Sequence, residues 1–414
     1  MKDTSTERLS ARMDQFVEHV GGVLKSRAQR TRFAEYALGL LLPGDRKSME
    51  PMAARIDPKH AMSRYKTFQK FISVSTWDDD AVRRAAWSWA RPVLEETGPA
   101  VAWIVDDTGF VKQGKHSVFV HRQYTGTAGK ITNCQVAVSL SFATEHQSMP
   151  LDFQLYMPEV WANDPGRRAV AKVPEELEFR TKPDIAIELI ERAVEQGVPL
   201  APVVADADYG KDQLFRAVLE MYGLDFAVGM HSTVTVLAPT ALGWSTSPRS
   251  IRDLVVSRGE SALEEVTWRE GTKKKPLSSR FSAVRVRLPK DDSAVFRQEP
   301  ELWLIAEWPK GDDGPTKFWL SNLPAEASLA NLVALIKSRW RIERDYEDLK
   351  GELGLDHFEG RSYVGWNHHV SVCMAAFAFL LTERMRHSPP DAIGFETLAT
   401  TTTDLRRRGS PVAA

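Results

Sequence analysis

Two stretches of the sequence run from apolar residues directly into aspartates. In IVDDTGF these are Asp106 and Asp107, and in PVVADAD they are Asp206 and Asp208. Adjacent aspartates repel each other and add nothing to a core, so each stretch indicates a cation close by. Hard metal ions prefer such oxygen ligands. A single strand ending in Asp is usually a helix cap or a turn, whereas two such strands in one mixed sheet can bring their carboxylates together.

A third acidic element lies in RWRIERDYEDLKGELG. With 3.6 residues per helical turn, Arg339, Glu343, Tyr346 and Lys350 are spaced by four, three and four residues and share one face. An Arg/Glu pair at this spacing is ordinarily a surface salt bridge worth a few tenths of a kcal/mol. Combined with the two acidic strand ends, the same face offers one carboxylate to a metal and two cations to phosphates.

The elements that position these residues follow from hydrophobic periodicity. Residues 7–40, 49–56, 61–75 and 78–96 are helical in pattern, which predicts a helical N-terminal domain over residues 1–98. From residue 99 the pattern becomes β-rich and then alternates helix and strand as far as residue 231, which predicts an α/β fold with a mixed sheet.

The C-terminal half continues this organisation. Residues 232–325 hold short strands joined by polar loops and predict a β-rich insertion. The core resumes over residues 326–386, with helices predicted at 328–353 and 366–386. The tail 387–414, with Pro389-Pro390 and three arginines, is predicted to be mobile.

Composition bounds the class of protein. The chain has 414 residues, two cysteines and a formal net charge of −1, which excludes a disulfide scaffold and fits a reducing cytoplasm. The longest apolar run, at 372–381, is half of the ~20 residues that span a bilayer, so we expect a buried helix and no membrane segment. Basic residues nevertheless concentrate locally: residues 1–70 hold 14 Lys and Arg against 8 Asp and Glu.

Three motifs together resemble one family. DDTGFVKQGKHSVFVHRQYTGTAGKITNCQVAVSL, VVADADYG and RWRIERDYEDLKGELGLDHFEGRS resemble the three acidic blocks of bacterial DDE transposases of the insertion-sequence 4 superfamily, most closely the insertion-sequence 701 family. The last block matches that superfamily's Tyr-Arg-Glu-Lys signature at Arg339, Glu343 and Lys350. Its tyrosine position, three residues before the arginine, is Ile336 here.

The resemblance implies an RNase H-like catalytic core, with two Mg²⁺ ions that Mn²⁺ could replace. It implies Asp107, Asp206 and Glu343 as catalytic metal ligands, with Asp106 and Asp208 as the alternatives at the first two positions. The implied activity is excision of an insertion sequence at its terminal inverted repeats, through hairpin ends, and joining to target DNA. Residues expected to contact DNA are Arg339, Lys350, Lys112, Lys115, Trp340 and Tyr346.

The implied partner is double-stranded DNA, bound by a homodimer in the cytoplasm near the nucleoid. Among the N-terminal helices, Arg27, Arg30, Arg32, Arg46 and Lys47 are the candidates for reading terminal repeats. Two other readings stay open at this point: a DNA-binding relative without catalysis, and a metal-dependent hydrolase of small phosphoesters. The cluster His368, His369 and Cys373 has too few ligands for a metal site and is expected to lie in a helix core or to face DNA.

Overall fold

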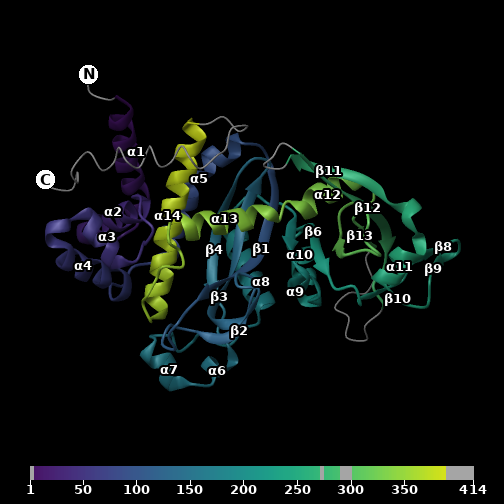
Figure 1. Cartoon of the computed structure of the whole chain (residues 1–414), viewed down its shortest axis with the longest axis horizontal. Helices are drawn as coiled ribbons and strands as arrows, with labels where there is room; N and C mark the ends of the chain where they lie inside the picture. Colours follow the sequence, from purple (N-terminus) through teal and green to yellow (C-terminus); the bar gives the residue numbers. More distant parts are fainter. Residues whose placement is uncertain (1–3, 271–274, 290–300, 388–414) are drawn as a thin grey trace. The chain divides into compact units, whose positions relative to one another are not determined.

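The computed structural model describes residues 4–270, 275–289 and 301–387. Lys273, Lys274 and almost all of the predicted tail lie outside the described residues. By its contacts the chain forms two compact units (Figure 1). Unit 1 comprises Met1–Pro99, Asp107–Thr181 and Ile342–Ala414, and unit 2 comprises Ala100–Asp106 and Lys182–Arg341.

The N-terminal part of unit 1 is helical, as the sequence predicts. Its helices are α1 (Thr4–Gly21), α2 (Arg27–Leu41), α3 (Met49–Ile56), α4 (Ala61–Ser73) and α5 (Asp79–Glu96). The expectation of one helical run over residues 7–40 is wrong, because the chain leaves the helix at Gly21-Gly22. Ser26 then starts α2 with a capping box that its side chain forms with Gln29.

Helix α14 (Tyr363–His387) is the core of unit 1 and contains the apolar run noted in the sequence (Figure 1). It packs against α2, α4, α5 and β4. By length and composition this helix could cross a membrane, but 89 % of its most apolar stretch is buried inside the protein. It therefore has the character of a core helix, as predicted.

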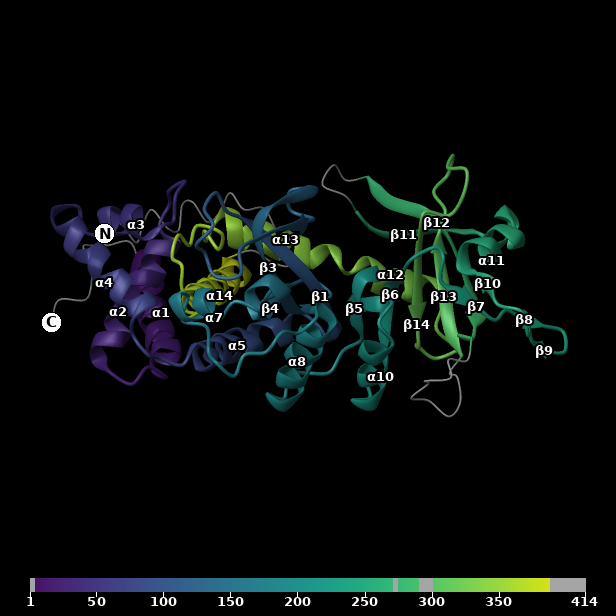
Figure 2. The same cartoon turned by 90° about the horizontal axis from the view of Figure 1, so that it is seen from below.

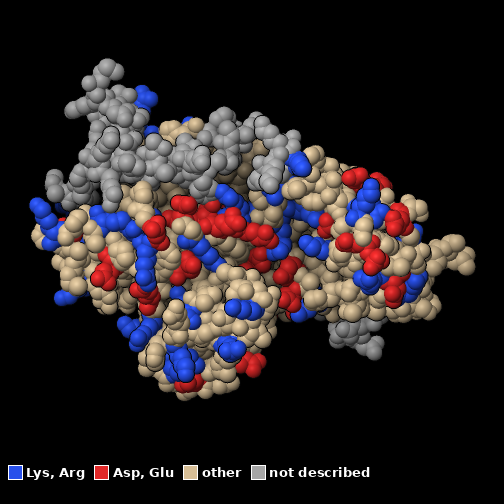
Figure 3. Space-filling model, in the orientation of Figure 1, with Lys and Arg blue, Asp and Glu red and all other residues tan. Residues whose placement is uncertain are grey.

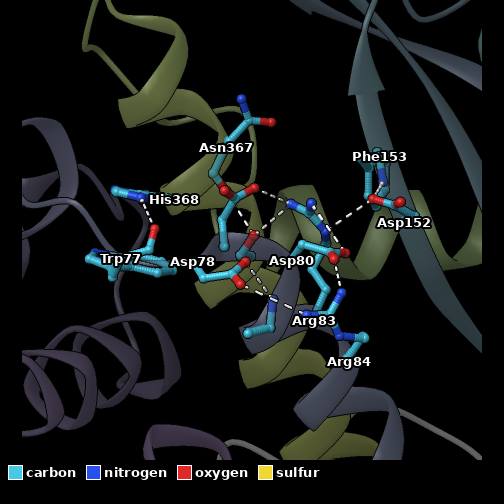
Figure 4. Close-up of polar contacts among 12 residues, drawn as sticks. Trp77, Asp78, Asp80, Arg83, Arg84, Asp152, Phe153, Asn367 and His368 are labelled. Carbon is cyan, nitrogen blue, oxygen red and sulfur yellow. Dashed lines mark hydrogen bonds and ion pairs between the residues drawn. The ribbon is translucent and has the colours of Figure 1, made fainter. Parts of the chain in front are cut away.

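A buried ion network joins α5, α14 and the neighbouring strand β4 (Figure 4). The Arg83 guanidinium contacts Asp79 at 2.7 Å, Asp152 at 3.0 Å and the Ser371 hydroxyl at 2.9 Å. Nearby, His368 stacks on Trp77 with 3.7 Å between ring centroids. Because a buried cation is tolerated only with such partners, the network fixes the helical domain on the sheet of unit 1.

The sheet of unit 1 is antiparallel. It contains the second half of β1 (Ala100–Val111), β2 (His121–Thr125), β3 (Lys130–Thr144) and β4 (Ser148–Leu155). Strand β3 pairs antiparallel with both β2 and β4 and neighbours β1. Short helices α6 (Glu159–Ala162) and α7 (Pro165–Val170) follow. This sheet continues the β-rich succession predicted after residue 99.

The sheet of unit 2 is mixed (Figure 2). The first half of β1 pairs parallel with β5 (Val203–Ala205), which pairs parallel with β6 (Phe226–Met230). Strand β6 then pairs antiparallel with β14 (Lys317–Ser321), and β13 (Leu302–Glu307), β12 (Pro276–Val286) and β11 (Glu264–Glu270) follow in that order. The insertion thus extends the sheet, and the predicted mixed α/β fold with a β-rich insertion is confirmed.

The remaining elements of unit 2 connect and cover these strands. They are α8 (Lys182–Glu195), α9 (Ala207–Gly210), α10 (Gln213–Met221), α11 (Ile251–Arg258) and α12 (Leu329–Lys337), together with the short strands β7 (Thr235–Val236), β8 (Pro239–Thr240), β9 (Gly243–Trp244) and β10 (Arg249–Ser250). Helix α9 packs on β6 and β14, and α12 packs on β6, β11 and β12.

The helix predicted over residues 328–353 is two helices. Helix α12 ends at Lys337, and α13 (Trp340–Gly351) begins three residues later. The Ser338 hydroxyl donates a hydrogen bond to the Leu335 carbonyl at 2.7 Å and so closes α12. Arg339 therefore lies in a turn rather than on the helical face of Glu343, Tyr346 and Lys350, and the predicted four-residue face is wrong at its first member.

Candidate active site

Two aspartates follow the paired residues of adjacent parallel strands in unit 2. Asp206 comes directly after the end of β5, as predicted, whereas Asp106 lies inside β1, which continues to Val111 rather than ending at the acids. Ile104 of β1 is in register with Val204 of β5, and both chains reach an aspartate two residues later, at Asp106 and Asp206. Side chains alternate faces along a strand, so residues two apart share a face. The carboxyl ends of parallel strands are also where α/β sheets place their ligands.

Asp206 is held by the start of α9. It is the N-cap of this helix, and its Oδ1 accepts a hydrogen bond from the backbone N–H of Asp208 at 2.9 Å. Strand β6 approaches this turn so closely that a Cβ on Gly229 would lie 2.8 Å from the Ala207 nitrogen and 3.0 Å from the Asp206 carbonyl carbon. A glycine is therefore required at position 229 to leave Asp206 where it is.

Asp208, the alternative acid on this strand, is exposed and has cationic partners. Its carboxylate contacts Lys211 at 2.9 Å and His231 at 3.9 Å. These contacts, led by the hydrogen bond from Lys211, hold the pKa of the Asp208 carboxyl below its usual value. The two neighbouring acids thus differ, because Asp206 caps a helix while Asp208 forms ion pairs at the surface.

Arg339 reaches Asp106 from the turn between α12 and α13. Its guanidinium lies 2.5 Å from Asp106 Oδ2, and the side chains are 31 % and 13 % exposed. The next residue, Trp340, has the Arg269 guanidinium over its ring at 3.8 Å and that of Arg341 at 5.1 Å. Two arginines, Arg269 of β11 and Arg341 of α13, thus lie over the half-buried Trp340 ring, while Arg339 in the turn is paired with Asp106.

In unit 1 the cation of the third motif is held by β1 and by the turn after β2. Lys350 Nζ donates to Thr108 Oγ1 at 2.7 Å, to the Gly109 carbonyl at 2.9 Å and to Thr127 Oγ1 at 3.3 Å. Thr108 and Gly109 directly follow Asp107 in the sequence. Burial lowers the pKa of Lys350 from 10.5 to about 8. Sequence reasoning missed Thr108 and Thr127, for which the only signal is the glycine-rich turn TGTAGK.

Glu343 and Tyr346 lie on α13 in contrasting environments. Glu343 is exposed in the first turn of the helix. Tyr346 is buried, with its hydroxyl 2.6 Å from Ser139 Oγ of β3. Tyr346 therefore anchors the helix on the sheet.

The two lysines after the first aspartate also differ. Lys112 Nζ donates to the Phe358 carbonyl at 2.8 Å and to the Asp356 carbonyl at 3.4 Å, and burial lowers its pKa. It holds the loop that follows α13. Lys115 is exposed, and its carbonyl accepts a hydrogen bond from Arg167 at 3.4 Å. Only Lys115 presents its ammonium group at the surface.

Lys47, a residue expected to read DNA, is buried instead. Its Nζ donates to the Leu40 carbonyl at 2.7 Å and to that of Leu42, which closes the end of α2. His369 is also buried: one ring nitrogen faces the Tyr36 hydroxyl at 2.9 Å, and burial lowers its pKa to about 4. The expectation of a helix-core role for the His368–His369 pair is confirmed, and the expectation for Lys47 is wrong.

The side chains of Asp107 and Glu343 in unit 1 and of Asp206 in unit 2 carry carboxylate oxygens, which are the donors that hard divalent cations prefer. Within the described residues, no group of three or more His, Cys, Asp or Glu side chains lies close enough together to form a metal cage. Mg²⁺ is usually bound by one or two carboxylates plus waters and substrate phosphates.

Comparison with known proteins identifies the family. The family model described as "DDE superfamily endonuclease" matches residues 19–275, which is more than half of the chain. The chain belongs to this family, as its motifs predict. It is also 32 % identical over 204 residues to "Probable transposase for insertion sequence element IS701" from Microchaete diplosiphon. That alignment covers 47 % of this chain and 49 % of the relative, so the chain spans about half the relative's length.

Proposed function

We propose that the chain is a transposase that cuts an insertion sequence at its terminal inverted repeats and joins it to target DNA. The observation that carries the proposal is the pair of parallel strands β1 and β5, which bring Asp106 and Asp206 to matching positions two residues beyond a paired register, with Arg339 bound to Asp106, in a chain of the DDE family. The relative named as a probable transposase of IS701 supports the same reading.

The proposed metal ligands are Asp107, Asp206 and Glu343, and the proposed ions are two Mg²⁺, which Mn²⁺ replaces. When bound, such ions neutralise charge on a phosphodiester and lower the pKa of an attacking water. This chain's part is to hold three carboxylates on secondary structure: Asp107 on β1, Asp206 at the cap of α9 and Glu343 on α13. Asp106 is proposed to orient Arg339 rather than to bind an ion.

The reaction needs no covalent protein intermediate. In the first step the oxygen of a water bonds to the scissile phosphorus, the bond to the 3′-oxygen breaks, and that oxygen takes up a proton. In the second step the freed 3′-hydroxyl gives up its proton and bonds to the phosphorus of a phosphodiester, either of the opposite strand to give a hairpin or of the target. The bond from that phosphorus to its own 3′-oxygen breaks, and this oxygen takes up a proton. Arg339 and Trp340 in unit 2 and Lys350 and Lys115 in unit 1 are the proposed DNA contacts, in a DNA-bridged homodimer in the cytoplasm near the nucleoid.

The test is incubation of the purified chain with Mg²⁺ and duplexes that carry the ends of its insertion sequence. The wild type should nick at the element boundary. Asp107→Asn, Asp206→Asn and Glu343→Gln should each reduce the nicking rate by at least about 10³-fold, because metal-assisted charge stabilisation is worth several kcal/mol. Their affinity for the same DNA in a gel shift should stay within about threefold.

The matched control is Asp208→Asn, which removes an acid from the same turn but leaves the proposed ligand set intact. It should nick within about threefold of the wild type. Specific binding without nicking by the wild type would favour a DNA-binding relative without catalysis. Hydrolysis of a nitrophenyl phosphate but not of DNA would favour a small-phosphoester hydrolase. Either result overturns the proposal.

A further inference from the structure

The segment between the first proposed metal ligand and the end of β3 has an unusual charge. Residues 108–144 include no Asp or Glu, although they carry Lys112, Lys115, Arg122 and Lys130. A run of 37 residues without an acid is a strong departure in a chain whose acids and bases nearly balance. Such a stretch gives a local positive potential on a protein with almost no net charge.

The hairpin β2–β3 displays this charge next to exposed apolar side chains. Tyr124 and Ile131 are directly opposite each other in the β2–β3 register and are 63 % and 59 % exposed. Arg122, two residues before Tyr124 and so on the same face, is exposed, and so is Lys130 at the turn. In Figure 3 the surface over β2 shows basic side chains among uncharged ones. Strand β2 is also an edge of the sheet among the described strands.

The hairpin has little means of reading a base sequence. Its three side-chain amides, which in DNA-binding proteins recognise adenine, are engaged within the hairpin and its neighbouring loops, and Gln135 is buried with its Nε2 donating to the Val118 carbonyl at 2.7 Å. Gln123 Nε2 donates to the Cys134 carbonyl at 3.2 Å, and Asn133 Nδ2 donates to the carbonyls of Lys112 at 2.6 Å and Gly114 at 2.9 Å. What remains exposed is one arginine, one lysine, a tyrosine and an isoleucine. The arginine and lysine bind phosphates irrespective of sequence and can read only guanine among the bases, and the tyrosine and isoleucine pack on sugars.

We propose that the β2–β3 hairpin, through Arg122, Lys130, Tyr124 and Ile131, is the docking surface for target duplex DNA. This inference rests on the proposed transposase function. An element end must be recognised by its sequence, whereas target docking can depend on phosphate and sugar contacts, so a face whose amides are engaged and whose only potential base readers are Arg122 and Lys130 suits the target. The turn of the same hairpin contributes Thr127 to the Lys350 ammonium group, which places the docked duplex beside the phosphate contacts of unit 1.

The experiment compares Arg122→Gln/Lys130→Gln and Tyr124→Ala with the wild type in three assays. These are nicking of element ends, joining of pre-nicked ends to a plasmid, and gel shift with a plasmid fragment lacking the repeats. Nicking should stay within about twofold. Joining should fall about tenfold through a raised KM for plasmid, and removal of two phosphate contacts should reduce the slope of log affinity against log salt by about 2.

The control is Arg258→Gln/Lys310→Gln, which removes the same charge from exposed positions of unit 2 and should leave joining unchanged. Equal losses of joining in the control and the hairpin variants would overturn the proposal, as would equal losses of nicking and joining in the hairpin variants. If the wild type neither nicks nor joins, the transposase function fails, and the gel shift still tests the hairpin. The proposal that the hairpin binds target DNA would be wrong if both hairpin variants bound the plasmid fragment as the wild type does, or if they lost self-association instead.

Discussion

The two cations of the third motif, Arg339 and Lys350, lie eleven residues apart in the sequence. Their side chains have partners of different charge. The guanidinium of Arg339 meets a carboxylate, that of Asp106, at 2.5 Å in unit 2. The ammonium of Lys350 meets two threonine hydroxyls and one carbonyl in unit 1. The contacts of Lys350 are neutral, so they orient the cation without cancelling its charge.

The Arg339–Asp106 ion pair therefore fixes the position of a side chain, whereas the Lys350 ammonium group keeps a positive charge that can bind an anion. Burial lowers the pKa of Lys350 to about 8 from 10.5, because its surroundings compensate the charge only partly. The shift of 2.5 units corresponds to about 3 kcal/mol against the charged form. A phosphate at Lys350 would restore that loss, whereas a phosphate at Arg339 must compete with Asp106. We therefore expect Lys350 to gain more from DNA than Arg339 does.

Among the tests of this comparison, we expect the largest effect on the nicking rate from removing the carboxylate that pairs with Arg339. Asp106→Asn keeps the shape but removes the ion pair, whose charge-assisted hydrogen bond is worth about 1.5–3 kcal/mol. If Asp106 orients Arg339, the nicking rate should fall about 10- to 100-fold. That loss is smaller than the one expected for Asp107→Asn, and it should be measured on the same DNA ends.

A double-mutant cycle with Arg339→Gln decides whether Asp106 acts through Arg339. The effects of Asp106→Asn and Arg339→Gln should be strongly non-additive, with the double variant close to Arg339→Gln alone. Additive losses, together with a loss of at least about 10³-fold for Asp106→Asn alone, would instead make Asp106 the metal ligand on β1.

The second test uses the pKa of Lys350. The free protein loses this proton as the pH rises through about 8. If the charge binds phosphate, kcat/KM on DNA should decline by up to about tenfold per pH unit above that value. Lys350→Arg, which stays charged, should be less active at pH 7 but should show no such decline. Parallel profiles for the two proteins would contradict the assignment.

The same titration has the opposite effect on folding. The pKa of Lys350 is lower in the folded state than in the unfolded chain, so between about pH 8 and 10.5 the unfolded chain binds more protons and the free energy of unfolding rises with pH. Compared with Lys350→Met, the wild type should gain up to about 3 kcal/mol over that range in denaturant titrations. Because Lys47, whose pKa is also lowered to about 8, is present in both proteins, its contribution cancels.

The sequence predicted which helices and strands are present better than the residues at which they begin and end. Hydrophobic periodicity found the helical N-terminal domain, the mixed sheet and the β-rich insertion, because each depends on local pattern. It missed the separation of α12 from α13, since residues 328–353 keep a helical pattern throughout and the break at Ser338 and Arg339 depends on a side-chain hydrogen bond to Leu335. As a result, the arginine of the motif was assigned to the wrong face.

For the candidate site, the sequence identified the acidic and basic residues but not the residues that hold them in position. Gly229 lies beside Asp206 only because β6 pairs with β5, and Thr127 meets Lys350 only because the β2–β3 turn folds over β1. Neither relation is visible as a spacing along the chain. Conversely, Lys47 and Tyr346 are residue types that often contact DNA, but both are buried. Only the tertiary packing reveals this burial.

The smallest test concerns the weakest of the three Lys350 contacts. Thr127→Val replaces a hydroxyl with a methyl group of similar size, and it removes an acceptor 3.3 Å from the ammonium. A single neutral hydrogen bond is worth about 0.5–1.5 kcal/mol, so kcat should fall about two- to tenfold with little change in KM for DNA ends. Thr127→Ser keeps the hydroxyl and should restore the rate.

The pH profile gives a second readout of the same contact. The Thr127→Val variant leaves the Lys350 ammonium group with fewer partners, so the decline in kcat/KM should begin at lower pH than in the wild type. A loss that Ser does not rescue, or an unmoved pH profile, would mean that Thr127 merely shapes the turn, and the arrangement around Lys350 would then depend on β1 alone.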